Sequence, residues 1–194
     1  MSYVARFEEI EGNLFRFDTR VYLGDFDIGI EGECIASIIG KNPGSASPSI
    51  TSRLAPLDLR GDKLLPFVRN RFLSAFRMMD KKPNKNSYIR IWNLFYLCNK
   101  DLNEAKFIYE KYNSVGFCPT ESKESPLNWF AWGPSDSYLD PYKARFLSKK
   151  LTNPFFYDNR KKTVSTSVPS ILNSVKHTQG MPALPIEKHL RKVL

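Results

Sequence analysis

The side chains best suited to chemistry stand in four short polar segments, each beside an apolar run. The first is GKNPGS at 40–45, whose glycines would let backbone amides approach a ligand or hold an anion. The second is Asn93 in the run IRIWNLFYL, an amide that can both donate to and accept from the edge of a nucleobase. WGPS at 132–135 is the third, and HTQGMP at 177–182 is the fourth. His177 in the fourth segment could stabilise a developing negative charge or a phosphate.

Each of these features also has a purely structural interpretation. Asn-Pro-Gly at 42–44 is ordinary turn chemistry at the end of a strand. Asn93 could be a core amide whose polar atoms are satisfied by backbone groups. A lone histidine in a surface loop is common. Residue types alone leave both interpretations open at each position.

Other kinds of site are excluded by the residues that are missing. GKNPGS has neither the P-loop spacing nor a GxGxxG pattern, and the chain has no GxSxG segment. The chain has 2 histidines and 3 cysteines, and the cysteines are widely spaced with no CxxC pair. This pattern excludes a disulfide framework and a zinc ribbon. We therefore expect no metal and no cofactor.

The elements that must position these segments alternate between strand and helix. Apolar runs at 33–39, 88–97 and 128–132 predict buried strands. Helical periodicity follows at 62–80, with Asp62 as its N-cap, at 101–113 and at 138–151, and a short basic helix ends the chain. The alternation predicts an α/β domain with a mainly parallel sheet. Ligands bind at the carboxyl ends of such strands, so the four polar segments should meet at one edge.

The flanking regions are less regular. Residues 13–23 indicate a strand or hairpin at the edge of the sheet, so 1–30 is interpreted as a β-rich N-terminal extension. Residues 153–176 are expected to be irregular or extended. Residues 1–194 are expected to form one domain, because the chain has ordinary domain length and 42% hydrophobic residues.

The positive charge lies in the last quarter of the chain. Residues 141–194 hold a surplus of basic over acidic residues equal to the net charge of +9, and the rest of the chain is balanced. Such a region is typical of a protein that binds a polyanion such as DNA, although a basic soluble surface is the alternative. The side chains chosen as DNA-backbone contacts are Lys149, Lys150, Arg160 and Lys161.

No apolar run is long enough to span a membrane, and the first residues lack the apolar stretch of a signal peptide. With the unpaired cysteines, this predicts a cytoplasmic protein with no membrane partner. We expect it to be a monomer.

The ordered set of segments resembles the uracil-DNA glycosylase superfamily. Members carry a G-x-[ND]-P-[GY] motif after the first core strand, an Asn ending an apolar strand, a strand ending in Trp-Gly, and a late His loop. The corresponding segments here are GKNPGSA, IRIWNLFYL, WFAWGPSDSY and HTQGMPA. The pattern is also similar to an uncharacterised bacterial and phage family with Leu-Asn-Pro-Ser, Asn-Leu-Phe and Ala-Trp-Gly segments. The resemblance implies a three-layer α/β/α fold and a base-excising enzyme that needs no metal.

The resemblance also implies roles for individual residues. Asn42 matches the position that holds or activates the attacking water, where many members have Asp. Asn93 matches the amide that binds the flipped base, and His177 the imidazole that stabilises the departing base. Met181 falls where the family places an apolar wedge that fills the gap in the duplex. The other residues expected to contact substrate are Gly40, Lys41, Pro43, Gly44, Ser45, Trp132, Ser135, Gln179 and Gly180.

Three hypotheses about function follow. The first is a monofunctional DNA glycosylase that extrudes a damaged or modified base and hydrolyses its glycosidic bond. The second is a non-catalytic, phage- or defence-related protein that binds DNA or nucleotide with the same fold. The third is an enzyme that acts on free nucleotides. Residues 45–66 contain no aromatic side chain to stack on the base, so Phe67, Trp92 and Trp132 are the candidates for that role.

Overall fold

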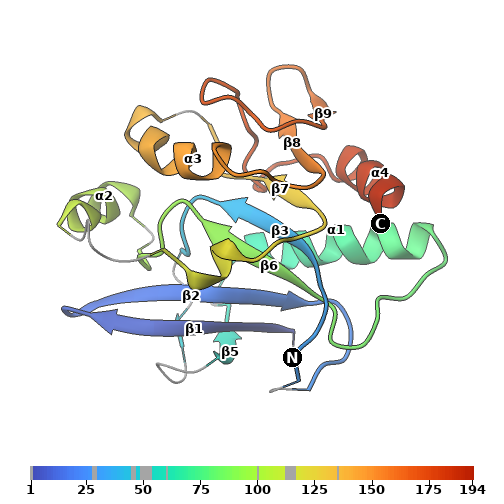
Figure 1. The fold of residues 1–194 in the computed structure, drawn as a ribbon, viewed down its shortest axis with the longest axis horizontal. Helices are drawn as coiled ribbons and strands as arrows, with labels where there is room; N and C mark the ends of the chain where they lie inside the picture. Colours follow the sequence, from blue (N-terminus) through green and yellow to red (C-terminus); the bar gives the residue numbers. More distant parts are fainter. Residues whose placement is uncertain are drawn as a thin grey trace.

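The computed structural model describes residues 2–27, 30–44, 47–48, 54–59, 61–99, 101–111, 117–134 and 136–194. Its strands are β1 (Tyr3–Ile10), β2 (Asn13–Tyr22), β3 (Cys34–Gly40), β4 (Ser47–Pro48), β5 (Leu54–Asp58), β6 (Tyr88–Asn93), β7 (Asn128–Phe130), β8 (Pro154–Asp158) and β9 (Thr163–Ser165). The α-helices are α1 (Leu64–Met78), α2 (Leu102–Glu110), α3 (Asp140–Leu147) and α4 (Ala183–Val193). Short 3-10 helices cover Pro119–Ser122 and Ser137–Leu139. The strands form one mixed sheet with helices on both faces (Figure 1).

The sheet has the strand order β4-β5-β1-β2-β6-β3-β7-β8-β9. Its four neighbouring strands β6, β3, β7 and β8 are parallel to one another. The remaining pairings between described strands are antiparallel, and they outnumber the parallel ones. The α/β class predicted from the sequence is therefore confirmed, but the prediction of a mainly parallel sheet is wrong. Short connections make β1–β2 and β8–β9 antiparallel, because a short connection reverses the chain, whereas β1–β5 and β2–β6 are antiparallel pairs between segments far apart in the sequence.

The N-terminal hairpin is part of this sheet rather than its edge. Strand β2 pairs with β1 on one side and with β6 on the other, so the expected edge position of 13–23 is wrong. Phe15, Phe17 and Val21 alternate along β2 and are buried, which explains why this strand lies inside the sheet. Strand β2 therefore lies directly beside β6, the strand that ends at Asn93.

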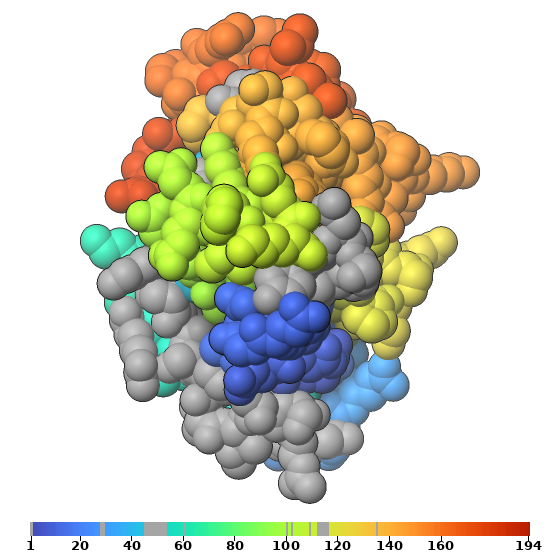
Figure 2. Space-filling model, turned by 90° about the vertical axis from the view of Figure 1, so that its left-hand side faces the viewer, coloured from blue at the N-terminus to red at the C-terminus, as the bar shows by residue number. Residues whose placement is uncertain are grey.

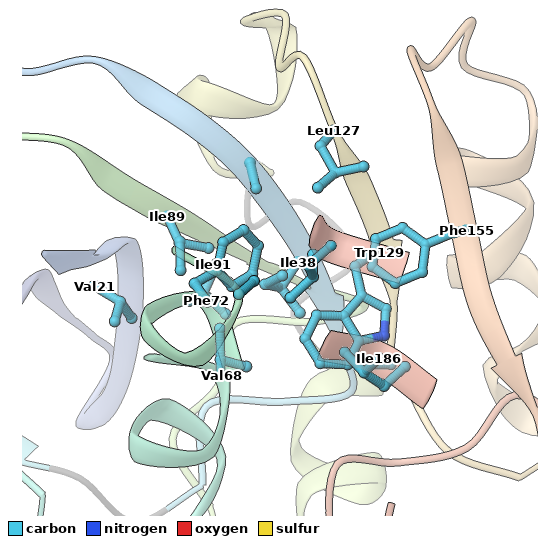
Figure 3. Packing of buried hydrophobic residues seen from close by; sticks show 14 of the residues in the cluster. Val21, Ile38, Val68, Phe72, Ile89, Ile91, Leu127, Trp129, Phe155 and Ile186 are labelled. Carbon is cyan, nitrogen blue, oxygen red and sulfur yellow. The ribbon is translucent and has the colours of Figure 1, made fainter. Parts of the chain in front are cut away.

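Helices α1 and α4 cover one face of the sheet. The sequence prediction of a helix over 62–80 is confirmed, because α1 buries Leu65, Val68 and Phe72 at helical spacing. These side chains pack with sheet residues of the same core cluster, which Figure 3 shows around Trp129. Asp62 Oδ1 accepts hydrogen bonds from the backbone N–H groups of Leu64 and Leu65, so its side chain caps the first turn as expected, but the N-cap position itself is Lys63, one residue later than predicted. The start of α1 is thereby fixed next to the end of β3.

Helices α2 and α3 lie on the opposite face. Their buried residues Ala105 and Phe146 belong to a second core cluster that includes Ile39, Trp92 and Phe130 of the sheet. Each of the parallel strands β3, β6 and β7 therefore contributes side chains to both cores. This double burial is why their sequences are continuous apolar runs.

Two segments differ from the sequence prediction in extent. The strand expected over 88–97 ends at Asn93, and 94–97 leaves the sheet except for a single bridge from Leu97 to Phe15. Residues 154–165, expected to be irregular or extended, form the β8–β9 hairpin. Strand β8 is the fourth parallel strand. The sequence did not predict it, because the segment is short and lies beside basic loop residues. Among the described residues, none of the helices has the length and apolar character needed to cross a membrane.

Candidate functional site

A cavity of about 550 Å³ opens at the carboxyl ends of β3 and β6. Its wall comes from the loop after β3, the segment leading into α1, the end of β6, the 177–180 loop and one residue of β2. Strands β6 and β7 lie on opposite sides of β3, so the order in which strands are added to the sheet reverses at β3. Crevices at such points are the usual ligand sites of α/β sheets. Figure 2 faces this end of the molecule, where α2 and the β1–β2 turn reach the surface.

The structure brings three of the polar residues selected from the sequence to one wall. Asn42, Asn93 and His177 all line the cavity, although they lie far apart along the chain. Pro43 and Gly44 also line it, as do Gln179 and Gly180. Ser45 and Ser135, which the sequence also selected, lie outside the described residues. The expected meeting of segments at one sheet edge therefore includes the first, second and fourth polar segments.

Asn93 is the most deeply buried of these polar residues, at 1% exposure. Its backbone oxygen accepts a hydrogen bond of 3.0 Å from the Arg145 guanidinium of α3, which holds the end of β6 in place. Its side-chain Nδ2 is buried and has no hydrogen-bond partner among the described residues. Leaving such a donor unpaired is costly unless a ligand supplies the acceptor. This geometry favours the binding interpretation of Asn93 over that of a satisfied core amide.

Gly40 makes room for the Asn93 side chain. The two residues are register partners in neighbouring parallel strands. A Cβ added to Gly40 would stand 2.8 Å from Asn93 Oδ1, closer than atoms of this kind normally approach. Gly40 does not itself line the cavity, where a contact with substrate was expected. It instead determines where the Asn93 amide lies.

Asn42 is oriented by one backbone group. Its Nδ2 donates a 2.8 Å hydrogen bond to the carbonyl oxygen of Asn99. This bond settles which end of the amide faces which way, and Oδ1 is left to accept from a ligand or water. An amide oxygen can hold a water molecule, but it cannot take a proton from it at neutral pH.

His177 is held in its neutral form. Its Nδ1 accepts a 3.2 Å hydrogen bond from the backbone N–H of Gln179, so the ring proton of the neutral imidazole is on Nε2. Burial lowers the pKa of His177, and the Lys41 ammonium lowers it further. A neutral ring with a proton on Nε2 is a hydrogen-bond donor at neutral pH. It can therefore stabilise a negative charge that develops in the cavity.

Lys41 does not line the cavity, contrary to its expected contact with substrate. Its Nζ and Cε lie beside Gly133, within 3.8 Å of the position that a Cβ there would occupy. Gly133 has a φ of +93°, and an added Cβ would also stand 3.4 Å from the Cβ of His177. The Trp-Gly segment after β7 thus contributes a close backbone approach behind the imidazole.

Three charged residues in the cavity wall were not selected from the sequence as site residues: Arg16, Asp62 and the exposed Lys63. Arg16 of β2 is 2% exposed, and its Nε and Nη1 atoms have no hydrogen-bond partner among the described residues. Asp62, whose side chain binds the first turn of α1, also lines the cavity, and its Oδ2 lies 3.8 Å from Arg16 Nη1. Arg16 could not be identified because an arginine in an alternating strand normally indicates a solvent-facing position.

Of the three aromatic residues that the sequence offers for stacking on the base, Phe67 lines the cavity, and Trp92 and Trp132 do not. Phe67 of α1 lines it, whereas Trp132 is 2% exposed and packs edge-on against Phe130 in the core beneath α2 and α3. The prediction that Trp132 contacts substrate is therefore wrong in this structure. Trp132 lies two residues after the end of β7, and the hydrophobic effect draws its indole into the apolar core. Phe67 takes its place as the candidate for stacking on a planar ligand.

Met181 does not form an exposed wedge. It is 5% exposed and packs in the same core cluster as Ile186 of α4. The sequence placed it in a polar loop, but the loop turns inward at this residue because α4 begins at Ala183. The exposed tip of the loop consists of Gln179 and Gly180.

The basic residues selected as DNA contacts divide between the two ends of the parallel strands. Arg160 and Lys161 are exposed and closely follow β8, at the same end as the cavity. Lys149 and Lys150 precede β8 and line a separate hollow at its amino end, with Lys149 Nζ donating to the Glu121 carbonyl. The fold therefore does not place all four residues on a single DNA-binding face.

Among the residues that the structure describes, no three His, Cys, Asp or Glu side chains gather in a way that could hold a metal ion. The reactive groups at the cavity include the amides of Asn42 and Asn93, the imidazole of His177, the charged pair Arg16 and Asp62, and the Lys63 ammonium. These groups can donate to acceptors, hold a water molecule and receive its proton.

No family model, curated protein or solved structure matches the chain.

Proposed function

We propose that this protein is a monofunctional DNA glycosylase, which extrudes a damaged or modified base into the cavity and hydrolyses its glycosidic bond. The observation that carries the proposal is the meeting of Asn42, Asn93 and His177 on the wall of one 550 Å³ cavity. These are the residues to which the resemblance to uracil-DNA glycosylases gives roles in water positioning, base binding and leaving-group stabilisation. A cavity of this size at a switch point is within the range of small-molecule sites.

The proposed binding of the base uses three groups. The Asn93 amide pairs with the hydrogen-bonding edge of the extruded base, so its buried Nδ2 gains the acceptor it lacks in the free protein. Phe67 provides an apolar ring on which the base can stack. Base extrusion costs on the order of a few kcal/mol, because base stacking is lost. These contacts offset part of that cost.

The proposed chemistry divides water activation between two residues. Asn42 Oδ1 positions the attacking water, because the other end of the amide is held by Asn99. The Asp62 carboxylate, which lines the same cavity, receives the proton that the water loses as it adds to the sugar. Neutral His177 donates its Nε2 proton in a hydrogen bond to the departing base.

DNA is the proposed partner, and the exposed basic residues after β8 are the proposed backbone contacts. Arg160 and Lys161 lie at the carboxyl end of the parallel sheet, on the side to which the cavity opens. We also propose that the protein acts as a monomer. A glycosylase-like three-layer arrangement is part of this proposal. The parallel strands β6, β3, β7 and β8 with helices on both faces support it.

A second candidate function is binding of DNA or nucleotide without cleavage. The observation that favours it is the amide at position 42, where a carboxylate would be the stronger base, together with the hydrogen bond that ties this amide to Asn99. In that case the cavity would hold an extruded base or a free nucleotide, and the Asp62 carboxylate would serve only to cap α1.

The deciding experiment measures abasic sites. Purified protein is incubated with duplexes that hold uracil, other deaminated bases or hypermodified pyrimidines, and alkali-labile sites are counted. We expect abasic sites from at least one duplex, lost in Asn42→Ala and Asn93→Ala but retained in the matched surface variant Asn84→Ala. No abasic sites from any duplex, with salt-sensitive duplex binding intact, would establish the second function instead.

A further inference from the structure

Arg16 is a buried charged group in the cavity wall that the proposed reaction has not used, whereas Lys63, another unused cation there, is exposed. It projects from β2, within the segment that the sequence suggested was an N-terminal extension. Its side chain is 2% exposed, and two of its guanidinium nitrogens, Nε and Nη1, are buried without a hydrogen-bond partner among the described residues. The Asp62 carboxylate is 3.8 Å away, which is beyond hydrogen-bond distance. A buried guanidinium whose Nε and Nη1 find no acceptor among the described residues is suited to take one from a ligand.

The charge on Arg16 is only partly balanced. The two groups that interact with it electrostatically are Cys98 and Asp62. Burial raises the pKa of the Cys98 thiol to about 11, so this group is neutral at physiological pH. Asp62 Oδ1 is shared by two backbone N–H groups at the start of α1. Because Lys63 also lines the cavity, two cations face the one Asp62 carboxylate there, and the wall is positive next to the donors of Asn93 and His177.

The depth of Arg16 indicates which part of a substrate it meets. The phosphates of a duplex stay at the protein surface, where exposed lysines and arginines bind them. An extruded base is the part of the substrate that enters a cavity. A residue that is almost fully buried in the cavity wall is therefore placed to contact the base rather than the DNA backbone.

We infer that Arg16 is a catalytic residue of the proposed glycosylase, whose guanidinium contacts the extruded base and stabilises the negative charge that this base acquires. The inference rests on the proposed function. The C1′–N bond breaks with both electrons remaining on the base nitrogen, and a water oxygen bonds to C1′. The proton released by the water passes through Asp62 to the base, so the products are the neutral base and an abasic sugar. Fixed positive groups aimed at a developing anion are a principal source of catalysis.

The experiment compares wild type, Arg16→Gln and Arg16→Lys by single-turnover base release from duplexes that hold 5-fluorouracil, uracil or thymine. These bases differ in how readily they leave as anions, and 5-fluorouracil leaves most readily. We expect Arg16→Gln to lower the rate on uracil by about 10²–10³-fold, as removal of an oxyanion donor does. The decrease should be smaller on 5-fluorouracil and larger on thymine, and Arg16→Lys should recover part of the rate. Duplex affinity should not change.

The matched control is Arg20→Gln, which removes another β2 arginine that pairs with Asp18 and does not line the cavity. A folded Arg16→Gln variant with the wild-type rate, or with the same fractional decrease on all three bases, would overturn the inference while the glycosylase proposal stands. If Arg16→Gln does not fold, the leaving-group dependence of Arg16→Lys decides in the same way. A wild-type protein that releases none of these bases or any other would instead overturn the proposed function, and the inference with it.

Discussion

Gly40 and Asn93 stand side by side in neighbouring parallel strands, and the position that a Cβ on Gly40 would take lies 2.8 Å from Asn93 Oδ1. The amide that lines the cavity thus depends on the absence of a side chain on the next strand. Because Asn93 is 1% exposed and its backbone is held by Arg145, the amide has little room to move aside. The residue at the end of β3 thus determines the position of the side chain at the end of β6.

The first prediction concerns this close approach. Gly40→Ala should displace the Asn93 amide, lowering base release by about 10²-fold, as small misplacements in active sites do. Overpacking should also destabilise the protein by about 1–3 kcal/mol. Urea denaturation and single-turnover assays measure the two effects. Gly24→Ala is the control, because its added Cβ meets only Pro83 at 4.0 Å. Equal activity of both variants would contradict the role given to Gly40.

The second prediction is a double-mutant cycle between the same residues. Removing the Asn93 side chain opens the space that a methyl group at position 40 needs, so Gly40→Ala should be less destabilising in an Asn93→Ala background. We expect a coupling of about 0.5–3 kcal/mol in the free energy of unfolding, the range for residues in contact. Additive effects of the two substitutions would show that the added methyl group is accommodated elsewhere.

The third prediction assigns the stacking surface. Phe67→Ala should weaken binding of the extruded base by about 1–3 kcal/mol, the usual cost of removing an aromatic platform. Phe76→Ala removes another partly buried ring of α1 that packs in the same core but does not line the cavity. Fluorescence titration with a duplex that holds a non-cleavable base analogue compares the two. Decreases of the same size in both variants would indicate general destabilisation of α1.

The sequence predicted the parts of the fold that depend on local patterns. Periodicity located α1, capping preference located Asp62 as the side chain that binds its first turn, and continuous apolar runs located β3 and β6. The pairing of β2 with β6 was not predictable, because it depends on contacts between residues about 70 positions apart, such as Thr19 with Ile91. That single pairing changes the sheet from mainly parallel to mostly antiparallel.

The candidate site divides in the same way. Asn42 and His177 were selected because they stand in polar, turn-rich segments that match the family pattern, and Asn93 because it interrupts an apolar strand; all three line the cavity. Arg16 carries no such signal, since only the side of β2 on which it lies reveals its burial. Trp132 and Met181 show the opposite error. Apolar side chains beside polar loops were interpreted as ligand contacts, but the protein core takes them up.

The fourth prediction concerns pH. The pKa of His177 is lowered from its ordinary value of 6.5, first by burial and then by Lys41. Between the folded-state pKa and 6.5 the unfolded chain binds more protons, so the stability contribution is complete above pH 6.5 and is lost as the pH falls through this window. Base release should fall at the acid end of the same window, because protonation of Nδ1 breaks its bond from Gln179.

Lys41→Met tests the electrostatic part of that prediction. Removing the ammonium should raise the pKa of His177 toward its ordinary value and move the acid limb of the rate profile to higher pH. A proton NMR titration of the imidazole signals measures the shift. His189 also has a lowered pKa, through burial and Lys192, so a His189→Gln background is needed to assign the signal. An unchanged His177 titration in Lys41→Met would show that burial alone lowers its pKa.

The last prediction separates the basic residues by their place in the fold. Arg160 and Lys161 follow β8 at the cavity end, whereas Lys149 and Lys150 lie at its amino end. If DNA approaches the cavity, Arg160→Gln with Lys161→Gln should weaken duplex binding and reduce the salt slope by about 0.9 for each phosphate that the variant no longer binds. Lys149→Gln with Lys150→Gln removes the same charge from the far end, so both affinity and slope should stay at wild-type values. Fluorescence anisotropy at several salt concentrations measures both quantities. A larger effect from the Lys149 and Lys150 pair would place the DNA at the opposite end of the sheet, away from Asn93 and His177.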